Sequence, residues 1–511
     1  MPLVGPPLER PLDPRDLLSL GLGRKPDEIA LASLEARWSW RELERAVDCL
    51  AGNLLALGLA PGDRIASLMP NRAELLIHYL ACFRAGLVAT PLNYRYMAAG
   101  VDHAIEVAEP AALLSHVERA ADLADSKLAG RLPLGQITFG GSGPGPRLEE
   151  LTSQAPADWR PPSVPSDAPA VIFFTSGSTG PPKGVTHSHE TLGWTLASFG
   201  AISTLTPADV VLPASSLSHG GSFKLSLAGL GAGAQVGVAR SRDADYLLPL
   251  LRRIRPTRML TLPSTLFSLV RAPGAEGADF ASLRFLIVGG DKVAAELQKE
   301  FDQLTGLELR EGYGMTEIGP AAGTPPDLPT KPGSLGRPGP SFTLSIRDES
   351  GLEVPAGKEG RLWAKSPCIM THYWNNEAAT RAAFTDGWFD TGDVMRADED
   401  GYLWFRGRRK QIIVHDGSNI CPQDVEGALI EHPAVANAGV VGIHDLLHGE
   451  DVRAYVTLKK EACAPSEAEL IDFARARVGY KAPEEIVVLE EMPFTVTGKV
   501  DRAALKQLAG G

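Results

Sequence analysis

The sequence predicts an α/β fold with more than one hydrophobic core, and three observations lead to that prediction. The chain has 511 residues, which is more than a single ordinary core accommodates. In its first part, segments with helical spacing of apolar residues alternate with short strand-like segments, as is typical of a covered parallel sheet. From residue 340 to 405 short strands and turns prevail, and the residues that follow again mix helix and strand.

The early elements follow directly from their residue patterns. Residues 38–58 carry apolar residues three and four apart, which predicts an amphipathic helix, and residues 73–86 predict a second one. Strands are expected in residues 61–70 (PGDRIASLMP), 87–93 (LVATPLN), 170–174 (AVIFF) and 284–293 (RFLIVGGDKV). The Gly-, Pro- and Ser-rich residues 140–169 predict a surface connection.

Composition limits the class of protein. The formal net charge of −12 argues against a nucleic-acid partner or a broad anionic-membrane surface. The five cysteines are scattered without a CxxC pair, which favours a reducing compartment over a disulfide framework or a zinc site. The amino terminus lacks the pattern of a secretion signal, and the uncharged residues 225–239 are fewer than the roughly 20 needed to span a bilayer. We therefore expect a cytoplasmic protein without a membrane span.

Residues 175–184 (TSGSTGPPKG) have the composition of a loop that holds a phosphate chain. Glycines 177 and 180 let the backbone approach an anion closely. Hydroxyl groups can donate to phosphate oxygens, and Lys183 supplies a mobile charge. The spacing does not fit a Walker loop. Composition alone leaves a flexible polar loop about equally plausible. The hydroxyl-bearing candidates are Thr175, Ser176, Ser178 and Thr179, and the glycines are Gly177 and Gly180.

Six further segments of the sequence decide how residues 175–184 are interpreted. In chain order they are GDRIASLMPN (62–71), REGYGMTE (310–317), WFDTGD (388–393), GYLWFRGRRKQII (401–413), GVVGIHDLLHGE (439–450) and TVTGKVDR (495–502). Together with TSGSTGPPKGV, they resemble the motifs of the acyl-adenylate-forming (AMP-binding) superfamily, in the family's order and over nearly the whole chain. Within that superfamily the chain looks most like the stand-alone acyl-CoA synthetases.

The resemblance implies an ATP site. In the family, the residue matching Tyr313 lies on adenine, that matching Thr316 contacts the α-phosphate, and that matching Glu317 binds Mg²⁺, which prefers hard oxygen ligands. Asp393 matches the aspartate that accepts both ribose hydroxyls, and Arg408 would contact the ribose or the phosphate. Taken singly, these would be a core tyrosine, a surface glutamate and a turn aspartate. The remaining expected nucleotide-binding residues are Gly312, Gly314 and Met315.

The resemblance also implies mobile elements. Lys499 matches a lysine that contacts the carboxylate and α-phosphate oxygens during adenylation, where a cation offsets charge repulsion. His219 matches a residue that gates the acyl and thiol tunnels, although an ordinary buried histidine remains an alternative. Lys410 matches the hinge about which a small carboxy-terminal domain rotates, and Gly417 would lie beside the path of CoA. Asp416 and Val414 depart from the family pattern, which puts the thiol contacts in doubt.

The acid substrate is less defined. Gly220, Gly289, Gly290 and Asp291 are expected to border the acyl pocket, and the glycines suggest room for a fatty or aryl acid. Residues 217–227 lack the aspartate that amino-acid-adenylating domains use, which disfavours amino acids. Lys224 could pair with a second carboxylate on the substrate, but we favour an exposed surface lysine. The histidines in THSHE (186–190) suggest a metal at first sight, but Ser188 or Thr186 as a helix cap is the better interpretation.

The predicted protein is an ATP-dependent acyl-CoA synthetase. It would form acyl-AMP from a carboxylic acid and Mg²⁺-ATP, release pyrophosphate, and transfer the acyl group to the thiol of CoA. Two alternatives remain: an adenylating enzyme that loads a carrier protein in trans, and a non-catalytic nucleotide-binding relative. We expect a large amino-terminal domain of stacked α/β layers with a β-rich part (1–409), and a small mobile α+β domain (410–511). A homodimer is also considered.

Overall fold

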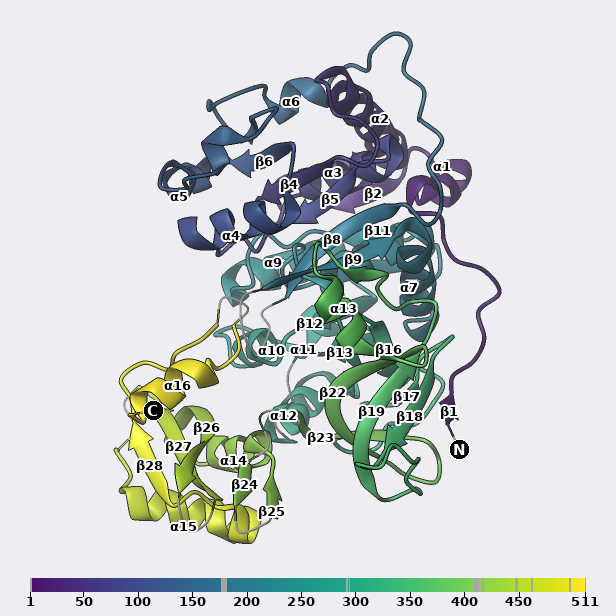
Figure 1. Ribbon diagram of the computed structural model, residues 1–511. Helices are drawn as coiled ribbons and strands as arrows, with labels where there is room; N and C mark the ends of the chain where they lie inside the picture. The colour runs from purple at the N-terminus through teal and green to yellow at the C-terminus, as the bar shows by residue number, and fades with distance from the viewer. Residues whose placement is uncertain are drawn as a thin grey trace.

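The computed structural model describes residues 2–175, 182–290, 293, 295–408, 411, 413–415, 418–445, 449–460, 463–495 and 498–510. The predicted α/β fold is confirmed: two seven-stranded sheets with covering helices form most of the large unit. A β-rich part is attached to them, and a smaller α+β unit follows at the carboxy terminus (Figure 1).

The first seven-stranded sheet carries the expected phosphate loop. Its strand order is β20-β9-β8-β5-β4-β6-β7. The pairs among β5, β4, β6 and β7, and the pair of β5 with β8, are parallel, whereas β8–β9 and β9–β20 are antiparallel. The bounds are β4 Arg64–Leu68, β5 Val88–Pro91, β6 Ala112–His116, β7 Gln136–Phe139, β8 Pro169–Thr175, β9 Lys183–Ser188 and β20 His372–Tyr373.

The second seven-stranded sheet is parallel except at one edge. Its order is β14-β13-β12-β10-β11-β2-β3, and only β2 and β3 run antiparallel. The predicted strand at residues 284–293 is β13, which ends before the glycine turn. The bounds are β2 Ile29–Ala32, β3 Arg37–Ser39, β10 Val210–Pro213, β11 Gln235–Gly237, β12 Arg258–Thr261, β13 Phe285–Val288 and β14 Arg310–Glu311.

Helices of the large unit join the two sheets, which share the largest hydrophobic core, while the second sheet also borders a core of its own. The predicted helices at residues 38–58 and 73–86 are α2 and α3, and Ser39 caps α2 through a capping box with Glu42. The ring of Phe223 on α8 contacts Tyr79 and Phe83 of α3 and Phe173 of β8. The bounds are α1 Ser19–Arg24, α2 Trp40–Ala56, α3 Ala73–Ala85, α4 Ala98–Ala108, α5 Ala120–Ala124, α6 Leu148–Leu151, α7 His189–Ile202, α8 Gly220–Gly231, α9 Ala244–Ile254, α10 Pro263–Val270, α11 Gly277–Phe280, α12 Ala295–Thr305 and α13 Glu377–Ala383.

The β-rich part lies where the residue pattern changes. A six-stranded antiparallel sheet has the order β1-β18-β19-β22-β21, with β23 also paired to β22. A three-stranded sheet, β15-β16-β17, carries the YGM segment. The bounds are β1 Leu3–Val4, β15 Tyr313–Met315, β16 Gly319–Gly323, β17 Arg337–Pro338, β18 Thr343–Arg347, β19 Glu359–Lys365, β21 Phe384–Thr385, β22 Trp388–Ala397 and β23 Leu403–Arg408.

The carboxy-terminal unit has its own sheet and its own core. The sheet order is β25-β24-β27-β26, with β28 parallel to β27, and its core includes Val440, Val456 and Leu470. The expected domain boundary at 409/410 falls on residues outside those described. The bounds are β24 Ile413–His415, β25 Ser418–Ile420, β26 Val435–Asp445, β27 Gly449–Leu458, β28 Glu485–Val488, α14 Pro422–Ile430, α15 Glu467–Val478 and α16 Arg502–Leu508.

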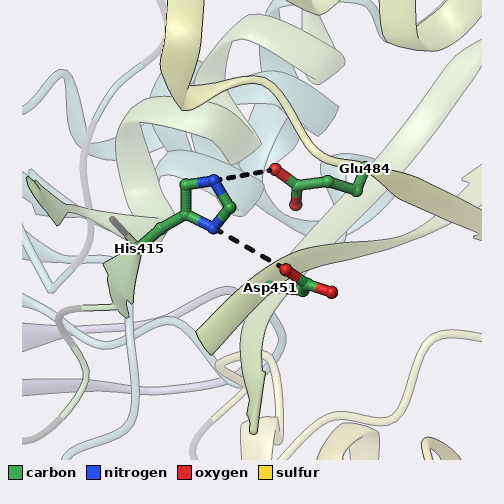
Figure 2. A group of neighbouring side chains, drawn as sticks. All are labelled: His415, Asp451 and Glu484. Carbon is green, nitrogen blue, oxygen red and sulfur yellow. Dashed lines mark ion pairs between the residues drawn. The ribbon is translucent and has the colours of Figure 1, made fainter. Parts of the chain in front are cut away.

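A histidine joins three segments of this unit (Figure 2). His415 donates from Nδ1 to the Glu450 carbonyl oxygen (2.8 Å). Its ring nitrogens also face carboxylates, Nδ1 at 3.8 Å from Asp451 and Nε2 at 3.4 Å from Glu484. The group brings one donor atom of each residue within 4.8 Å of the others, with one carboxylate at each ring nitrogen. It holds the end of β24 against β27.

Within the described ranges, no helix combines the length and the apolar character that crossing a membrane requires. Of the uncharged residues 225–239, residues 225–231 form the second half of the buried helix α8.

Candidate active site

The expected phosphate loop lies between two hydrogen-bonded strands. Thr175 at the end of β8 is the cross-strand partner of Lys183 at the start of β9. Ser176, Gly177, Ser178, Thr179 and Gly180 lie outside the described residues. The Lys183 ammonium lies over the ring of Tyr373, 4.6 Å from its centroid, a cation–π contact. Lys183 therefore sits at the base of the hairpin, within reach of the loop.

Tyr373 also links this lysine to Glu317. The Tyr373 hydroxyl donates to Glu317 Oε1 at 3.1 Å, and the Glu317 residue is only 7% exposed. Burial and the neighbouring Glu317 carboxylate raise the pKa of the Tyr373 hydroxyl well above its usual range. Tyr373 belongs to β20, which pairs with β9 at Val185. One sheet thus holds Lys183, Tyr373 and, through a hydrogen bond, Glu317 together. Sequence reasoning missed Tyr373, which no motif marks.

A second group joins two motifs far apart in the chain. The Tyr313 hydroxyl donates to Asp393 Oδ2 (2.6 Å), and Arg408 Nε donates to Asp393 Oδ1 (3.0 Å). Asp393 and Arg408 are cross-strand partners on β22 and β23. Within β22, Gly392 directly before Asp393 has a φ of +70°, a conformation that glycine adopts without strain. A carboxylate has further lone pairs, so Asp393 can still accept hydroxyl groups.

The Asp393 carboxyl is 1% exposed. Burial raises its pKa above the usual value, although the charges of Arg408 and Lys499 and the hydrogen bond from Tyr313 act in the opposite direction. The group is therefore a desolvated acceptor whose ionised form depends on its partners. A hydroxyl or cation arriving here meets an environment in which electrostatic interactions are strong.

Thr316 is held through its backbone. Its carbonyl oxygen accepts a hydrogen bond from His187 Nε2 (2.8 Å) and another from Lys224 Nζ (3.1 Å). Burial lowers the pKa of His187 to about 3, with Lys224 adding to the effect, so the imidazole is neutral. The two hydrogen bonds fix the backbone segment that carries the Thr316 hydroxyl.

The histidines of THSHE are therefore structural. Ser188 is the N-cap of α7 in a capping box with Thr191, so the prediction of a helix cap at this segment is confirmed. His187 instead supports the Thr316 carbonyl, a role that sequence reasoning missed. The sequence did not indicate this role of His187, because the neighbouring Ser188 already explained the segment as the start of a helix.

Glycines shape the neighbouring backbone. A Cβ on Gly314 would come within 2.4 Å of the Gly319 carbonyl oxygen, and one on Gly312 within 3.3 Å of the Ala322 carbonyl oxygen. Gly290 has a φ of +92°, which disfavours a side chain. A Cβ on Gly289 would meet only the Gly312 carbonyl oxygen, at 4.0 Å. Met315, the last residue of β15, packs against the main core, and Asp291 lies outside the described residues.

His219 begins the helix that carries Gly220. It is the N-cap residue of α8, without a side-chain cap bond, and its Nε2 is buried with no hydrogen-bond partner among the described groups. Burial, followed by the charges of Arg242, Lys499 and Arg95, lowers the pKa of His219 to about 4. The imidazole is therefore neutral at physiological pH.

Lys499 comes from the other unit and acts on the same region. Its side chain is exposed, yet its charge lowers the pKa of both His219 and Asp393. Its backbone is bonded to Thr495 in both directions, and Gly498 beside it has a φ of +86°. In Figure 1 the yellow chain that precedes α16 reaches toward the large unit. Lys410 and Gly417, the expected hinge and CoA-path residues, lie outside the described residues.

Comparisons with known proteins identify the class. Residues 21–374 match the model of the AMP-binding enzyme family, and residues 424–499 match its AMP-binding enzyme C-terminal domain. The chain belongs to the AMP-binding enzyme family, and the resemblance that its motifs carry is confirmed.

Individual relatives indicate the type of enzyme within this family. The chain is 33% identical to an indoleacetate–CoA ligase of Aromatoleum aromaticum, over 95% of this chain and 96% of that protein. It is also 33% identical to the medium-chain fatty-acid–CoA ligase of Escherichia coli, over 94% and 88%. The predicted activity agrees with these relatives: the chain is an ATP-dependent acyl-CoA synthetase, an acid–thiol ligase that uses ATP and CoA. The two relatives are named for different acids.

Solved structures add information on the arrangement of the two units. The chain superposes on ATP-bound MatB from Rhodopseudomonas palustris with a TM-score of 0.88 and 28% identity, covering 97% of this chain and 98% of that one. Against apo MatB, at the same identity and coverage, the TM-score is 0.78. The described arrangement is therefore closer to the ATP-bound form of that relative.

Proposed function

We propose that this enzyme activates its acid at the meeting point of β8–β9, β15, β22–β23 and the chain before α16, and we assign roles to the residues there. The observation that carries the proposal is convergence. Residues from five motifs are brought together by the Lys183–Tyr373–Glu317 contacts, by the Tyr313–Asp393–Arg408 bonds, and by the charge of Lys499. Attack of the carboxylate on the α-phosphorus needs cations, acceptors and positioning of this kind.

The Tyr313–Asp393–Arg408 group would hold the nucleoside. Asp393 accepts the ribose hydroxyls with its remaining lone pairs, while Tyr313 and Arg408 keep the carboxylate oriented. The ring of Tyr313 offers a face for adenine. The Thr316 hydroxyl would donate to the α-phosphate, from a backbone held in place by the hydrogen bonds of His187 and Lys224 to the Thr316 carbonyl oxygen.

The phosphate end would lie on the β8–β9 hairpin. Lys183 and Thr175 flank the segment 176–182, and Lys183 neutralises phosphate charge. The donor set fits Mg²⁺: Glu317 is a buried carboxylate, a hard oxygen ligand, whose Oε1 is oriented by Tyr373. When bound, the ion would supply charge neutralisation to the phosphates.

Lys499 would act at the attacking end of the reaction. Its charge lowers the pKa of both Asp393 and His219, which is consistent with a location between the ribose site and the acyl entrance. The better superposition on an ATP-bound relative supports an adenylation arrangement. A cation there offsets the repulsion between carboxylate and phosphate. The neutral His219 would then border the acyl and thiol paths.

The domain organisation is part of the proposal. We divide the chain at 409/410, with Lys410 as the pivot and Gly417 beside the CoA path, so that one unit can serve adenylation and thioester formation in turn. Separate cores in the two units support this division. A cytoplasmic location remains our expectation from the scattered cysteines.

The test is AMP release from Mg²⁺-ATP over a panel of fatty, aryl and dicarboxylic acids, each with and without CoA. We expect release that requires both an acid and CoA. Pyrophosphate exchange that needs an acid but gives no CoA-dependent turnover would point to a carrier protein as the acceptor. No exchange with any acid would overturn the assignment.

A further inference from the structure

Lys224 is a buried cation at the proposed acyl pocket. The expectation that it lies on the surface is wrong: the residue is 2% exposed, and its side chain is among the largest that are fully buried. The cause is its helix, since eight other residues of α8 are buried as well, on all its sides. A lysine in such a helix cannot reach bulk water and extends back toward the helix start.

The ammonium points to the proposed site. Its Nζ lies 3.7 Å from where a Cβ on Gly220 would stand, and the Thr316 hydroxyl oxygen lies 4.0 Å from that same point. The ammonium and the hydroxyl that we assign to the α-phosphate are thus no more than about 8 Å apart. One small acid can reach both.

The charge of Lys224 is poorly compensated. An ammonium has three donors, and among the described residues one hydrogen bond is formed, to the Thr316 carbonyl oxygen. The remaining contact is the face of Phe173, 5.6 Å away. Within the same described part of the chain, no carboxylate pairs with Nζ within 4.0 Å, and Glu317 acts on it only at longer range. His187, which faces the same carbonyl, is neutral.

The group nevertheless keeps its proton at neutral pH. Burial lowers the pKa of Lys224 to about 8, with Cys368 and Glu317 acting in the opposite direction. A desolvated ammonium with unused donors favours an anionic oxygen partner, and a charge-assisted bond in such a site is strong.

Resting on the proposed function, we propose that Lys224 determines acid specificity by binding a second carboxylate of the substrate, so that the enzyme prefers dicarboxylic acids. The reacting carboxylate faces Thr316 and Lys499, and the second carboxylate lies against Nζ beside Gly220. The absence of a side chain at Gly220 leaves the space between them. Lys224 takes no part in bond making, which occurs only at the first carboxylate.

The experiment compares matched acids on two variants. AMP release with CoA gives kcat/KM for adipate against hexanoate and for succinate against butyrate, with the wild type, Lys224→Met and Lys224→Gln. Lys365→Met, which removes an exposed lysine, is the control. We expect the wild type to prefer the dicarboxylic member of a pair, and both Lys224 variants to lower that preference at least about 100-fold, as loss of one buried ionic partner does. The wild-type preference should also fall as the pH rises above 8.

Each other outcome is decisive. A wild type that uses monocarboxylic acids only would overturn the specificity proposal and leave the proposed function standing. An equal loss for both members of each pair, in variants whose thermal unfolding shows a folded protein, would assign Lys224 to the reacting carboxylate or phosphate and overturn the proposal. If the wild type releases AMP with no acid at all, the proposed function fails, and the specificity proposal fails with it.

Discussion

The two lysines proposed to contact the carboxylates of the acid, Lys224 and Lys499, differ in burial, in hydrogen bonding and in the unit that carries them. Lys224 is buried in α8 and hydrogen-bonded to the Thr316 backbone, in the same unit as the ribose and metal groups. Lys499 is exposed, lies in the small unit, and reaches the site through its charge. The comparison teaches that the large unit holds prearranged, desolvated groups, whereas the small unit contributes a group that can be withdrawn without breaking a core.

The largest loss of activity is expected from a change in the large unit, which holds the prearranged groups. Asp393→Ala removes the acceptor shared by Tyr313 and Arg408 and leaves the guanidinium partly buried without its carboxylate. It also removes the carboxylate assigned to the two ribose hydroxyls, and because each hydrogen bond to a charged group contributes about 1.5–3 kcal/mol, kcat/KM for ATP should fall about 1,000-fold. The rate of pyrophosphate exchange at different ATP concentrations measures this fall in kcat/KM. Glu359→Gln, which disrupts an ion pair with Arg406 elsewhere in the β-rich sheets, should leave the rate unchanged. A loss below threefold would exclude Asp393 from the nucleotide site.

Lys499, the exposed lysine of the small unit, should affect acyl-AMP formation but not thioester formation. Lys499→Ala should slow acyl-AMP formation about 100- to 1,000-fold, the usual range for one preorganised donor. Transfer from supplied acyl-AMP to CoA should stay within about threefold, because the charge is needed only while the phosphate is attacked. Single-turnover assays of each step separate the two. Lys506→Ala, on the nearby α16, is the matched control. An equal loss of rate in both steps would contradict the assignment of Lys499 to acyl-AMP formation alone.

The burial of Lys224 should make the free energy of unfolding depend on pH. Its pKa is about 8 in the folded protein, against 10.5 for an exposed lysine. The unfolded chain therefore binds more protons between these values, and stability gains as pH rises from 8 toward 10.5. Lys224→Met should be more stable than the wild type by up to about 3 kcal/mol at pH 7, with the difference lost by about pH 10.5. Denaturant unfolding of both proteins at several pH values measures this. A difference independent of pH would mean that the ammonium is not desolvated.

The smallest effect tests a single hydrogen bond. Tyr313→Phe keeps the ring and removes the hydroxyl that donates to Asp393. We expect KM for ATP to rise about tenfold with kcat nearly unchanged, since a bond to a charged group contributes about 1.5–3 kcal/mol. Tyr246→Phe, which loses a bond to Glu35 at an exposed site, should behave as wild type. A fall in kcat at constant KM would place the hydroxyl in the chemical step instead.

Much of the fold was predictable because its signals are local. Apolar spacing marked α2 and α3, continuous apolar runs marked β8 and β13, and the change of pattern near residue 340 marked the β-rich sheets. Motifs also marked the segments that carry Tyr313, Asp393 and Lys499. Tyr313 begins β15 and Lys499 follows a glycine with positive φ, whereas Asp393 lies within β22 directly after Gly392, which also has a positive φ.

The failures concern contacts between segments far apart in the chain. Tyr373 and His187 act on Glu317 and Thr316 across sheet pairings that no local pattern encodes. Lys224 was misjudged because lysine is usually exposed, and only the packing of α8 against neighbouring elements shows otherwise. The apolar residues that flank it were the one available signal.

The pairing of Arg408 with Asp393 has a consequence for the reach of the small unit. Because Arg408 is the last residue of β23 and is bonded into the large unit, the chain is anchored there until residue 408, and β24 begins at Ile413. The end of β23 and the start of β24 are thus only five positions apart along the chain. So short a tether gives Lys499 a high effective concentration at the nucleotide, since that concentration falls as a connection lengthens. Loosening Arg408 would lengthen the tether and dilute the lysine, without altering either group.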